Sequence, residues 1–338
     1  MSLPDSKARP DATEAAKARP DAEPAPADRS EGGSVDLDGV SSELGTFAAF
    51  GEFDESLASA EAVGIDSGST LVKLCARDQT GALHFGTWRS PSQDRVIELL
   101  ERLAPERIGV TGSGGMALLA AIAESPALGG PARPVAHPIE FEAWGRGAEA
   151  MLERLGLASE APYLLVSIGT GTSALRVSRE GVERVGGTAL GGGTALGLGL
   201  ALTDCQTHDE LMALAARGDR RRVDLLISDV YPLADIPLTA DATAASFGKL
   251  VREPGTTPRA EDLADALLAL VAENVALLSI AQARAADVSR IVYGGSTLSR
   301  NPRLIETLRQ LGSMMGLESI VLPHSGHAGA LGSMLLGI

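Results

Sequence analysis

Short apolar stretches separated by glycine-rich or hydroxyl-rich turns recur along the chain from residue 62 onward. Residues 62–66 and 71–76 are two such stretches of strand length, and the turn between them contains glycine, serine and threonine. Because two strands joined by a tight turn form a β-hairpin, this stretch predicts a hairpin. Its turn has the size and composition that suit a phosphate group.

The same strand, turn and strand pattern returns in the second half of the chain, where residues 163–168 and 173–177 flank a turn at 169–172. Periodicity predicts further strands at 107–111 and 290–293, and helices at 93–103, from 116, at 142–155, 208–217 and 261–286, and from 327. Hairpins mixed with helices predict an α/β fold of two lobes with mixed sheets. We expect an N-terminal lobe at 61–158 and a C-terminal lobe at 159–338.

The chain before residue 61 has a different composition. Residues 1–45 consist mainly of Ala, Pro, Asp, Glu and Ser and predict a disordered acidic tail. Phe47, Phe50, Phe53 and Leu57 then recur at helical spacing. This spacing predicts a short helix within residues 46–60 that docks on the core.

Charge and composition narrow the classes of partner. The net charge is −15 and no stretch is rich in Lys and Arg, so the electrostatic footprint of a nucleic-acid or anionic-membrane binder is missing. One uncharged run, 185–202, is as long as a membrane span, but it is rich in Gly and Thr and poor in bulky residues. Cys75 and Cys205 lack metal-site spacing, which indicates a reduced, cytoplasmic setting. We therefore expect a small-molecule partner and no membrane.

The two hairpin turns are the first candidates for chemistry. Asp66 ends a predicted strand, so its carboxylate can hold Mg²⁺ while backbone N–H groups of the turn meet phosphate oxygens. The turn at 169–172 has the same setting, and two such turns facing one another would clamp a polyphosphate between the lobes. Neither is a Walker A loop, because no Gly-Lys-Ser/Thr follows at the required spacing. A plain pair of hairpins is the alternative.

A third candidate is the glycine-rich stretch 184–197, whose consecutive glycines at 191–193 allow a close approach to the backbone. A nucleotide is the simplest group to approach there, and a neighbouring helix is the alternative. Glu140 follows a proline-containing stretch at a predicted helix start, where a carboxylate can project into a cleft as a general base. Glu142 is the competing carboxylate. A solvent-exposed acid that complements the helix N-terminus is the other interpretation of Glu140.

Taken in order, these motifs resemble the type II (eukaryotic-type) pantothenate kinases, which belong to the actin-like ATPase superfamily of acetate and sugar kinases, heat-shock chaperones and actin. The resemblance covers residues 62–338 and rests on the stretches 64–73, 140–142, 167–173, 184–197, 216–220, 223–225, 229–231, 244–248 and 293–296. It implies a two-lobed actin-like (ribonuclease H-like) fold with ATP in the interlobe cleft. It also implies transfer of the ATP γ-phosphoryl group to the terminal hydroxyl of pantothenate, the first step of coenzyme A biosynthesis.

The same resemblance implies roles for single residues. Glu140 matches the catalytic base, Arg184 the residue that grips pantothenate, and Asp66 the residue that organises Mg²⁺. Contacts to ATP are implied for Gly68, Ser69, Thr70, Lys73, Thr170, Gly192, Gly193, Thr194 and Ser296. The family is dimeric and uses ATP with Mg²⁺, so a homodimer and both cofactors are implied.

Two positions depart from the family pattern. Ser69 takes the place of a glycine, which requires a negative φ at that residue. His208 falls where relatives carry an aromatic side chain near the ligand, so the sequence does not fix the shape of the pocket. Feedback by coenzyme A or its thioesters varies across the family, and neither feedback nor acceptance of pantetheine follows from the sequence.

Other functions stay open at this point. Another small-molecule kinase of the same fold, such as a sugar or amino-sugar kinase, would share the two turns. A non-catalytic ATP-binding regulator would bind ATP without turnover, and Ser69 is the one feature that suggests it. An activator of radical dehydratases needs cysteines for a cluster between subunits, for which Cys75 and Cys205 are poorly placed.

Overall fold

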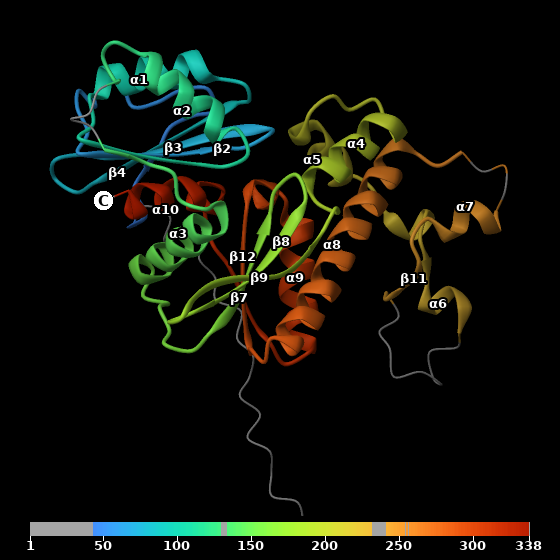
Figure 1. Cartoon of the computed structure of the whole chain (residues 1–338). Helices are drawn as coiled ribbons and strands as arrows, with labels where there is room; N and C mark the ends of the chain where they lie inside the picture. Colours follow the sequence, from blue (N-terminus) through green and yellow to red (C-terminus); the bar gives the residue numbers. More distant parts are fainter. Residues whose placement is uncertain (1–42, 130–133, 232–240, 254, 256, 338) are drawn as a thin grey trace, which may run out of the picture. The chain divides into compact units, whose positions relative to one another are not determined.

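Two mixed sheets carry the part of the chain that the structure describes (Figure 1). The structure is a computed structural model that describes residues 43–129, 134–231, 241–253, 255 and 257–337. All of these residues belong to one compact unit. The predicted tail, residues 1–45, lies outside the described residues except for its last positions, 43–45.

The first sheet has the strand order β1-β4-β3-β2-β5-β6. Its strands are β1 (Thr46–Phe47), β2 (Ala62–Ser67), β3 (Leu71–Arg77), β4 (Leu83–Arg89), β5 (Arg107–Thr111) and β6 (Val135–Ala136). The central strand β2 pairs antiparallel with β3 and parallel with β5, and β3 pairs antiparallel with β4. The predicted first hairpin is thereby confirmed.

The second sheet repeats this plan in the order β13-β12-β7-β8-β9. Its strands are β7 (Tyr163–Ile168), β8 (Thr172–Ser178), β9 (Gly181–Thr188), β12 (Arg290–Gly294) and β13 (Glu318–Val321). Here β7 pairs antiparallel with β8 and parallel with β12, so it takes the place that β2 has in the first sheet. The duplicated order confirms the two-lobed, mixed-sheet fold of the actin-like ATPases. A separate ribbon joins β10 (Leu225–Leu226) to β11 (Thr243–Ala245).

Helices connect the strands and cover the sheets. The α-helices are α1 (Gln93–Leu103), α2 (Gly115–Glu124), α3 (Glu140–Arg154), α4 (Gly192–Leu202), α5 (His208–Ala215), α6 (Ile227–Val230), α7 (Gly248–Arg252), α8 (Ala260–Ala285), α9 (Pro302–Met314) and α10 (Ala328–Leu336). Short 3-10 helices are η2 (Arg220–Arg222), η4 (Ser296–Leu298) and η5 (Ser325–His327). Among the described residues, only α8 is long and apolar enough by composition to cross a membrane, and 67% of its most apolar window is buried within the protein. A buried core helix has this same composition.

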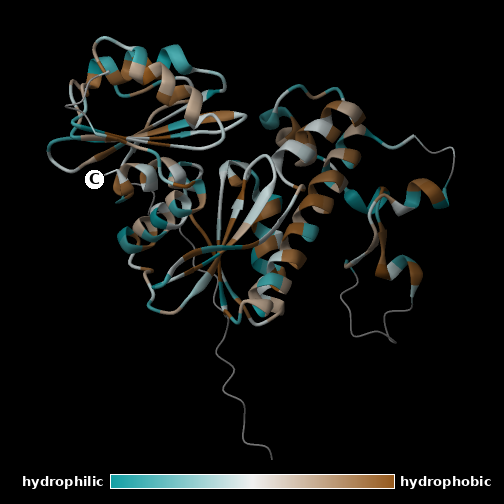
Figure 2. Ribbon diagram, viewed as in Figure 1, coloured by the Kyte–Doolittle hydropathy of each residue, from teal (hydrophilic) through white to brown (hydrophobic). Residues whose placement is uncertain are grey.

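The central strands place polar residues at one edge of each sheet. β2 is buried along its whole length and is apolar until the polar residues at its C-terminal end. Figure 2 shows apolar residues along the strands in the middle of the second sheet and more polar ones along β9. Because β2 and β5 are parallel, their C-terminal ends lie at the same edge, and β7 and β12 end together in the second sheet. Chemistry is expected where such strands end.

Helix α10 packs between the first sheet and α3 (Figure 1). Glycines make this packing close, because a Cβ atom at Gly64 in β2 or at Gly147 in α3 would overlap a backbone oxygen of α10. A Cβ atom at Gly332 of α10 would likewise overlap the backbone of α3. Helix α10 therefore fixes β2 relative to α3, and these two elements carry Asp66 and Glu140.

Residues 43–60 form an extended segment, which we call the N-terminal strap. The short helix predicted for this segment is wrong. Instead, β1 pairs in parallel with the edge strand β4, and backbone N–H groups of the strap donate to carbonyl oxygens of β4. Donors paired with an edge strand are not free to form helical hydrogen bonds. Phe53 and Leu57 are buried against the first sheet, whereas Phe50 is 59% exposed.

Candidate active site

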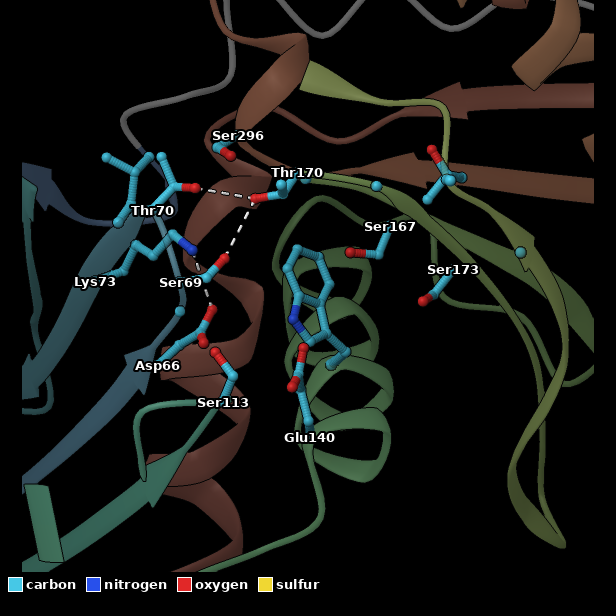
Figure 3. A pocket seen from close by; sticks show the side chains of 18 of the residues that line it. Asp66, Ser69, Thr70, Lys73, Ser113, Glu140, Ser167, Thr170, Ser173 and Ser296 are labelled. Carbon is cyan, nitrogen blue, oxygen red and sulfur yellow. Dashed lines mark hydrogen bonds and ion pairs between the residues drawn. The ribbon is translucent and has the colours of Figure 1, made fainter. Parts of the chain in front are cut away.

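A cavity of about 590 Å³ lies between the turns that follow β2 and β7 (Figure 3). Turn residues from both sheets line it, together with the start of α3 and part of β9. The residues predicted for the site that line this cavity are Asp66, Gly68, Ser69, Thr70, Lys73, Glu140, Thr170, Arg184 and Ser296. The fold thus brings together polar residues that are far apart in the sequence.

Asp66 stands at the C-terminal end of β2, lines the cavity and is only 3% exposed. Lys73 Nζ lies 3.3 Å from Asp66 Oδ2, and this ion pair compensates the buried negative charge. A Cβ atom at Gly112 or at Gly329 would press on the Asp66 carboxylate, so both glycines leave room for it. A buried carboxylate held in this way suits a hard cation such as Mg²⁺.

The two hairpin turns face each other through hydroxyl groups (Figure 3). Thr170 Oγ1 lies 3.0 Å from Thr70 Oγ1 and 3.5 Å from Ser69 Oγ. Positive φ values occur elsewhere in the described chain but not at Ser69, so its side chain replaces a glycine without backbone strain. The turns form two walls of the cavity, lined by hydroxyl groups.

Glu140 is the first residue of α3 and its carboxylate opens into the cavity. Glu140 is exposed to the cavity, but the protein atoms around it partly desolvate the carboxylate. This desolvation raises the pKa of Glu140 above its usual range. The negative charge of Asp66 raises this pKa further, and Lys73 opposes the rise. A raised pKa makes a carboxylate a better proton acceptor near neutral pH. Glu142, the competing carboxylate, is exposed and does not line the cavity.

Arg184 lies in β9, on the cavity wall next to the helix that carries Glu140. Its guanidinium carbon is 5.8 Å from the centroid of the Phe141 ring, which is a cation–π distance. This contact holds a permanent positive charge at the cavity wall, next to the first turn of α3. A guanidinium group at such a wall is suited to bind a carboxylate of a small molecule.

The glycine-rich stretch 184–197 is ordered as a strand, a turn and a helix. The backbone N–H groups of Gly192 and Gly193, at the start of α4, donate to carbonyl oxygens of the second hairpin turn at 2.8 and 2.9 Å. The group that approaches the backbone of these glycines is therefore the second hairpin turn, residues 169–172. Gly192, Gly193 and Thr194 do not line the cavity. Gly192 and Gly193 support the turn through these two hydrogen bonds.

His208 begins α5 and is not part of the cavity lining. Its Nε2 is buried and has no hydrogen-bond partner among the described residues. Burial lowers the pKa of His208, so the ring is neutral at pH 7. An effect of His208 on the ligand pocket stays a prediction.

The sequence patterns do not single out several residues of the cavity wall. Ser113 follows β5, the parallel neighbour of β2, and strand adjacency is the signal that places it near Asp66. Trp144 lies one helical turn after Glu140, on the same face of α3. Ser167 and Ser173 are the ends of the stretch 167–173 named above, and Figure 3 shows them on the opposite side of the cavity from Asp66 and Lys73.

Comparisons with known proteins place the chain in a family. The Fumble family model matches residues 141–336. The type II pantothenate kinase of Oceanobacillus iheyensis is 34% identical over 274 residues, which cover 81% of this chain and 98% of that protein. The chain belongs to the type II pantothenate kinase family. The type II pantothenate kinase of Staphylococcus aureus strain MRSA252 is 30% identical over 275 residues, which cover 81% of this chain and 99% of that protein.

Membership in the type II pantothenate kinase family makes the chain a phosphotransferase. Among solved structures, a ROK hexokinase from Thermus thermophilus is 19% identical, with a TM-score of 0.42 over 82% of this chain and 97% of that chain. These values are too low to bear on the site. Roles for the cavity residues of this pantothenate kinase family member are therefore proposed below from the geometry of the cavity.

Proposed function

We propose that this chain phosphorylates pantothenate with ATP, giving 4′-phosphopantothenate in the first step of coenzyme A biosynthesis. The observation that carries the proposal is the meeting of Glu140 with Asp66 and Lys73 in one cavity between two hydroxyl-rich turns. Family membership suggests pantothenate as the substrate. In the cavity, Glu140 is the proposed base, and Lys73 with Asp66 is proposed to neutralise charge. Phosphoryl transfer needs mainly positioning and charge neutralisation, so this set of groups suits the reaction.

In the proposed reaction the polyphosphate lies between the two facing turns, with Lys73 beside its oxygens and Ser296 towards the nucleoside. Arg184 binds the carboxylate of pantothenate and directs the terminal hydroxyl to Glu140. Glu140 accepts the hydroxyl proton as the oxygen attacks the γ-phosphorus. The bond between the γ-phosphorus and the β,γ-bridging oxygen breaks, and ADP leaves.

The described residues contain no group of three or more His, Cys, Asp and Glu side chains able to hold a metal ion. A Mg²⁺ ion that binds together with a nucleotide needs only one or two protein carboxylates, because phosphate oxygens and water complete its shell. Asp66 fits this requirement, since it is buried and lines the cavity, and Gly112 and Gly329 leave room for its carboxylate. When bound there, Mg²⁺ supplies neutralisation of the β- and γ-phosphate charge.

A turnover assay tests the proposed function. We expect the full chain to release ADP from ATP and Mg²⁺ in the presence of pantothenate, with 4′-phosphopantothenate detected by mass spectrometry. The same assay is run with a panel of sugars and amino sugars. Turnover only with a sugar would identify another kinase of this fold, and nucleotide binding without turnover on any acceptor would identify a non-catalytic regulator.

Arg184→Ala is expected to raise the KM for pantothenate about 10- to 100-fold, because a hydrogen bond to a charged group is lost. The KM for ATP should stay close to that of the wild type. Arg179→Ala is the matched control, since Arg179 is exposed at the turn between β8 and β9 and does not line the cavity. An unchanged pantothenate KM in Arg184→Ala would remove this residue from the substrate site.

The positions of both cysteines argue against the hypothesis that the chain is an activator of radical dehydratases. Cys75 and Cys205 are free and buried, so neither can share a cluster with a partner subunit. Burial raises the pKa of the Cys75 thiol, which keeps it protonated and unreactive. We propose a cytoplasmic setting, in which such thiols stay reduced.

We also propose that the chain forms a homodimer. Support comes from exposed leucines on two helices that pack together, namely Leu198, Leu200 and Leu202 on α4 and Leu277 on α8. Exposed apolar side chains such as these leave water when two chains associate. Leu200→Asp is expected to shift the mass in light scattering from the dimer to the monomer, whereas Met116→Asp on α2 leaves it unchanged. A wild type that is monomeric at micromolar concentration contradicts the proposal.

A further inference from the structure

Three aromatic rings stack face to face between the N-terminal strap and the turn that precedes α10. Phe47 of the strap lies between Phe85 of β4 and His324, with ring centroids 4.5 and 3.8 Å away and interplanar angles of 6° and 16°. His327 is tilted against the same stack, and its Nε2 is 2.8 Å from Thr87 Oγ1. The stack therefore joins the edge of the first sheet to a turn that follows the last strand of the second sheet.

The turn on which Phe47 rests also holds the loop after β12. The buried backbone N–H of Gly295 donates to Ser325 Oγ at 3.1 Å. Gly326 packs against Ser296, since a Cβ atom at Gly326 would lie 3.4 Å from Ser296 Cα. Ser296 lines the cavity beside the second hairpin turn (Figure 3). His324, whose ring contacts Phe47, is the immediate neighbour of the residue that holds this loop.

The backbone of the turn is strained in a way that needs support. His324 has a left-handed φ of 51°, which is uncommon for a residue with a side chain. Such conformations persist where the surroundings hold them. Burial lowers the pKa of His324, and it lowers the pKa of His327 to about 4, so both rings are neutral at pH 7 and suited to aromatic packing. The Phe47 ring is the neighbour that covers the face of His324.

The strap precedes the family motifs in the chain. Matches of 274 and 275 residues cover 98% and 99% of those proteins, whereas this chain has 338 residues. The family motifs begin at Gly64, after the strap. The contact between Phe47 and the turn is therefore made by a residue that precedes those motifs.

We propose that Phe47 is a positioning residue for nucleotide binding, which holds the His324 turn and through it the loop at residues 295–296. This inference rests on the proposed function, because that function assigns Ser296 to the nucleotide. Phe47 acts through the turn and touches neither substrate. Nucleotide affinity therefore depends on the strap, and pantothenate affinity does not.

Binding of the ATP analogue AMP-PNP with Mg²⁺, measured by calorimetry on the full chain, tests the inference. Phe47→Ala is expected to weaken binding about three- to tenfold, the range that corresponds to one lost aromatic stack. Phe50→Ala is the matched control in the same strap and should bind like the wild type, because Phe50 is exposed. The KM for pantothenate should be the same in all three proteins. AMP-PNP binding is measured without pantothenate, so it can fail or succeed independently of the phosphorylation reaction. Wild-type turnover with pantothenate tests the proposed function separately.

Further variants separate the ring contact from loss of strap packing. Phe47→Leu keeps an apolar side chain but removes the ring, and it should weaken AMP-PNP binding as Phe47→Ala does, with an unchanged melting temperature. His324→Asn removes the partner ring while tolerating a left-handed backbone, so its effect and that of Phe47→Ala should not add in the double variant. Wild-type affinity in Phe47→Leu, equal weakening in Phe50→Ala, or simple additivity would each overturn the inference.

Discussion

Replacing Glu140 by glutamine is expected to lower kcat for pantothenate phosphorylation about 10²- to 10⁴-fold, the usual contribution of a general base. Glutamine keeps the shape of the side chain at the start of α3 but cannot accept a proton. Binding of ATP should persist, because the two hairpin turns are untouched. Steady-state kinetics with both substrates varied, together with AMP-PNP binding, measure the two effects separately.

The pH profile of the wild type provides a second test of the same base. A carboxylate accepts a proton only when ionised, and burial and Asp66 raise the pKa of Glu140. We therefore expect kcat/KM to fall as the pH drops through a pKa higher than that of an ordinary glutamate, and to level off above it. Glu142→Gln should keep both rate and profile, since Glu142 is exposed outside the cavity. Full activity in Glu140→Gln would assign the base elsewhere.

Asp66→Asn is expected to lower kcat about 10²- to 10³-fold and to raise the Mg²⁺ concentration needed for half-maximal activity. The substitution keeps the size of the side chain and removes its charge, so Lys73 loses the partner that lies 3.3 Å away. A titration of activity against Mg²⁺ at saturating ATP measures the effect. Circular dichroism and a melting curve show whether the unpaired, partly buried Lys73 also lowers stability.

Asp94→Asn is the control for Asp66→Asn, because Asp94 is exposed in the first turn of α1 and does not line the cavity. It should leave the Mg²⁺ titration unchanged. A normal Mg²⁺ requirement in a folded Asp66→Asn protein would show that the ion is held by other groups.

Much of this site could be predicted from the sequence because its parts are local. A strand that ends in Asp66 and a turn rich in glycine and hydroxyl groups define the first wall, and the repeat at residues 169–172 defines the second. Turn composition and strand alternation depend on nearest neighbours, so they are readable without the fold. The roles of Glu140 and Arg184 came from resemblance to a family, since an isolated acid or arginine carries no local signature.

The predictions that failed depended on tertiary contacts. Apolar residues at helical spacing in the strap predicted a helix, but an edge strand offered its backbone hydrogen bonds and Phe47 joined the sheet. Helix propensity is a weak preference that packing overrides. Ser113 and Trp144 were missed because their place at the site depends on which strands and helices are neighbours in the fold, and the sequence pattern does not show this.

The position of α10 in the sequence has a consequence for how this protein is made. The first sheet and α3 leave the ribosome early, whereas residues 328–336, which lock them together, follow nearly two hundred residues after Glu140. N-terminal parts of a chain fold first during synthesis, so the glycine-lined surfaces of β2 and α3 wait uncovered while the second sheet is translated. The two carboxylates of the site reach their final separation only when α10 emerges. Until α10 emerges, β2 and α3 lack the packing that fixes Asp66 relative to Glu140 in the finished protein.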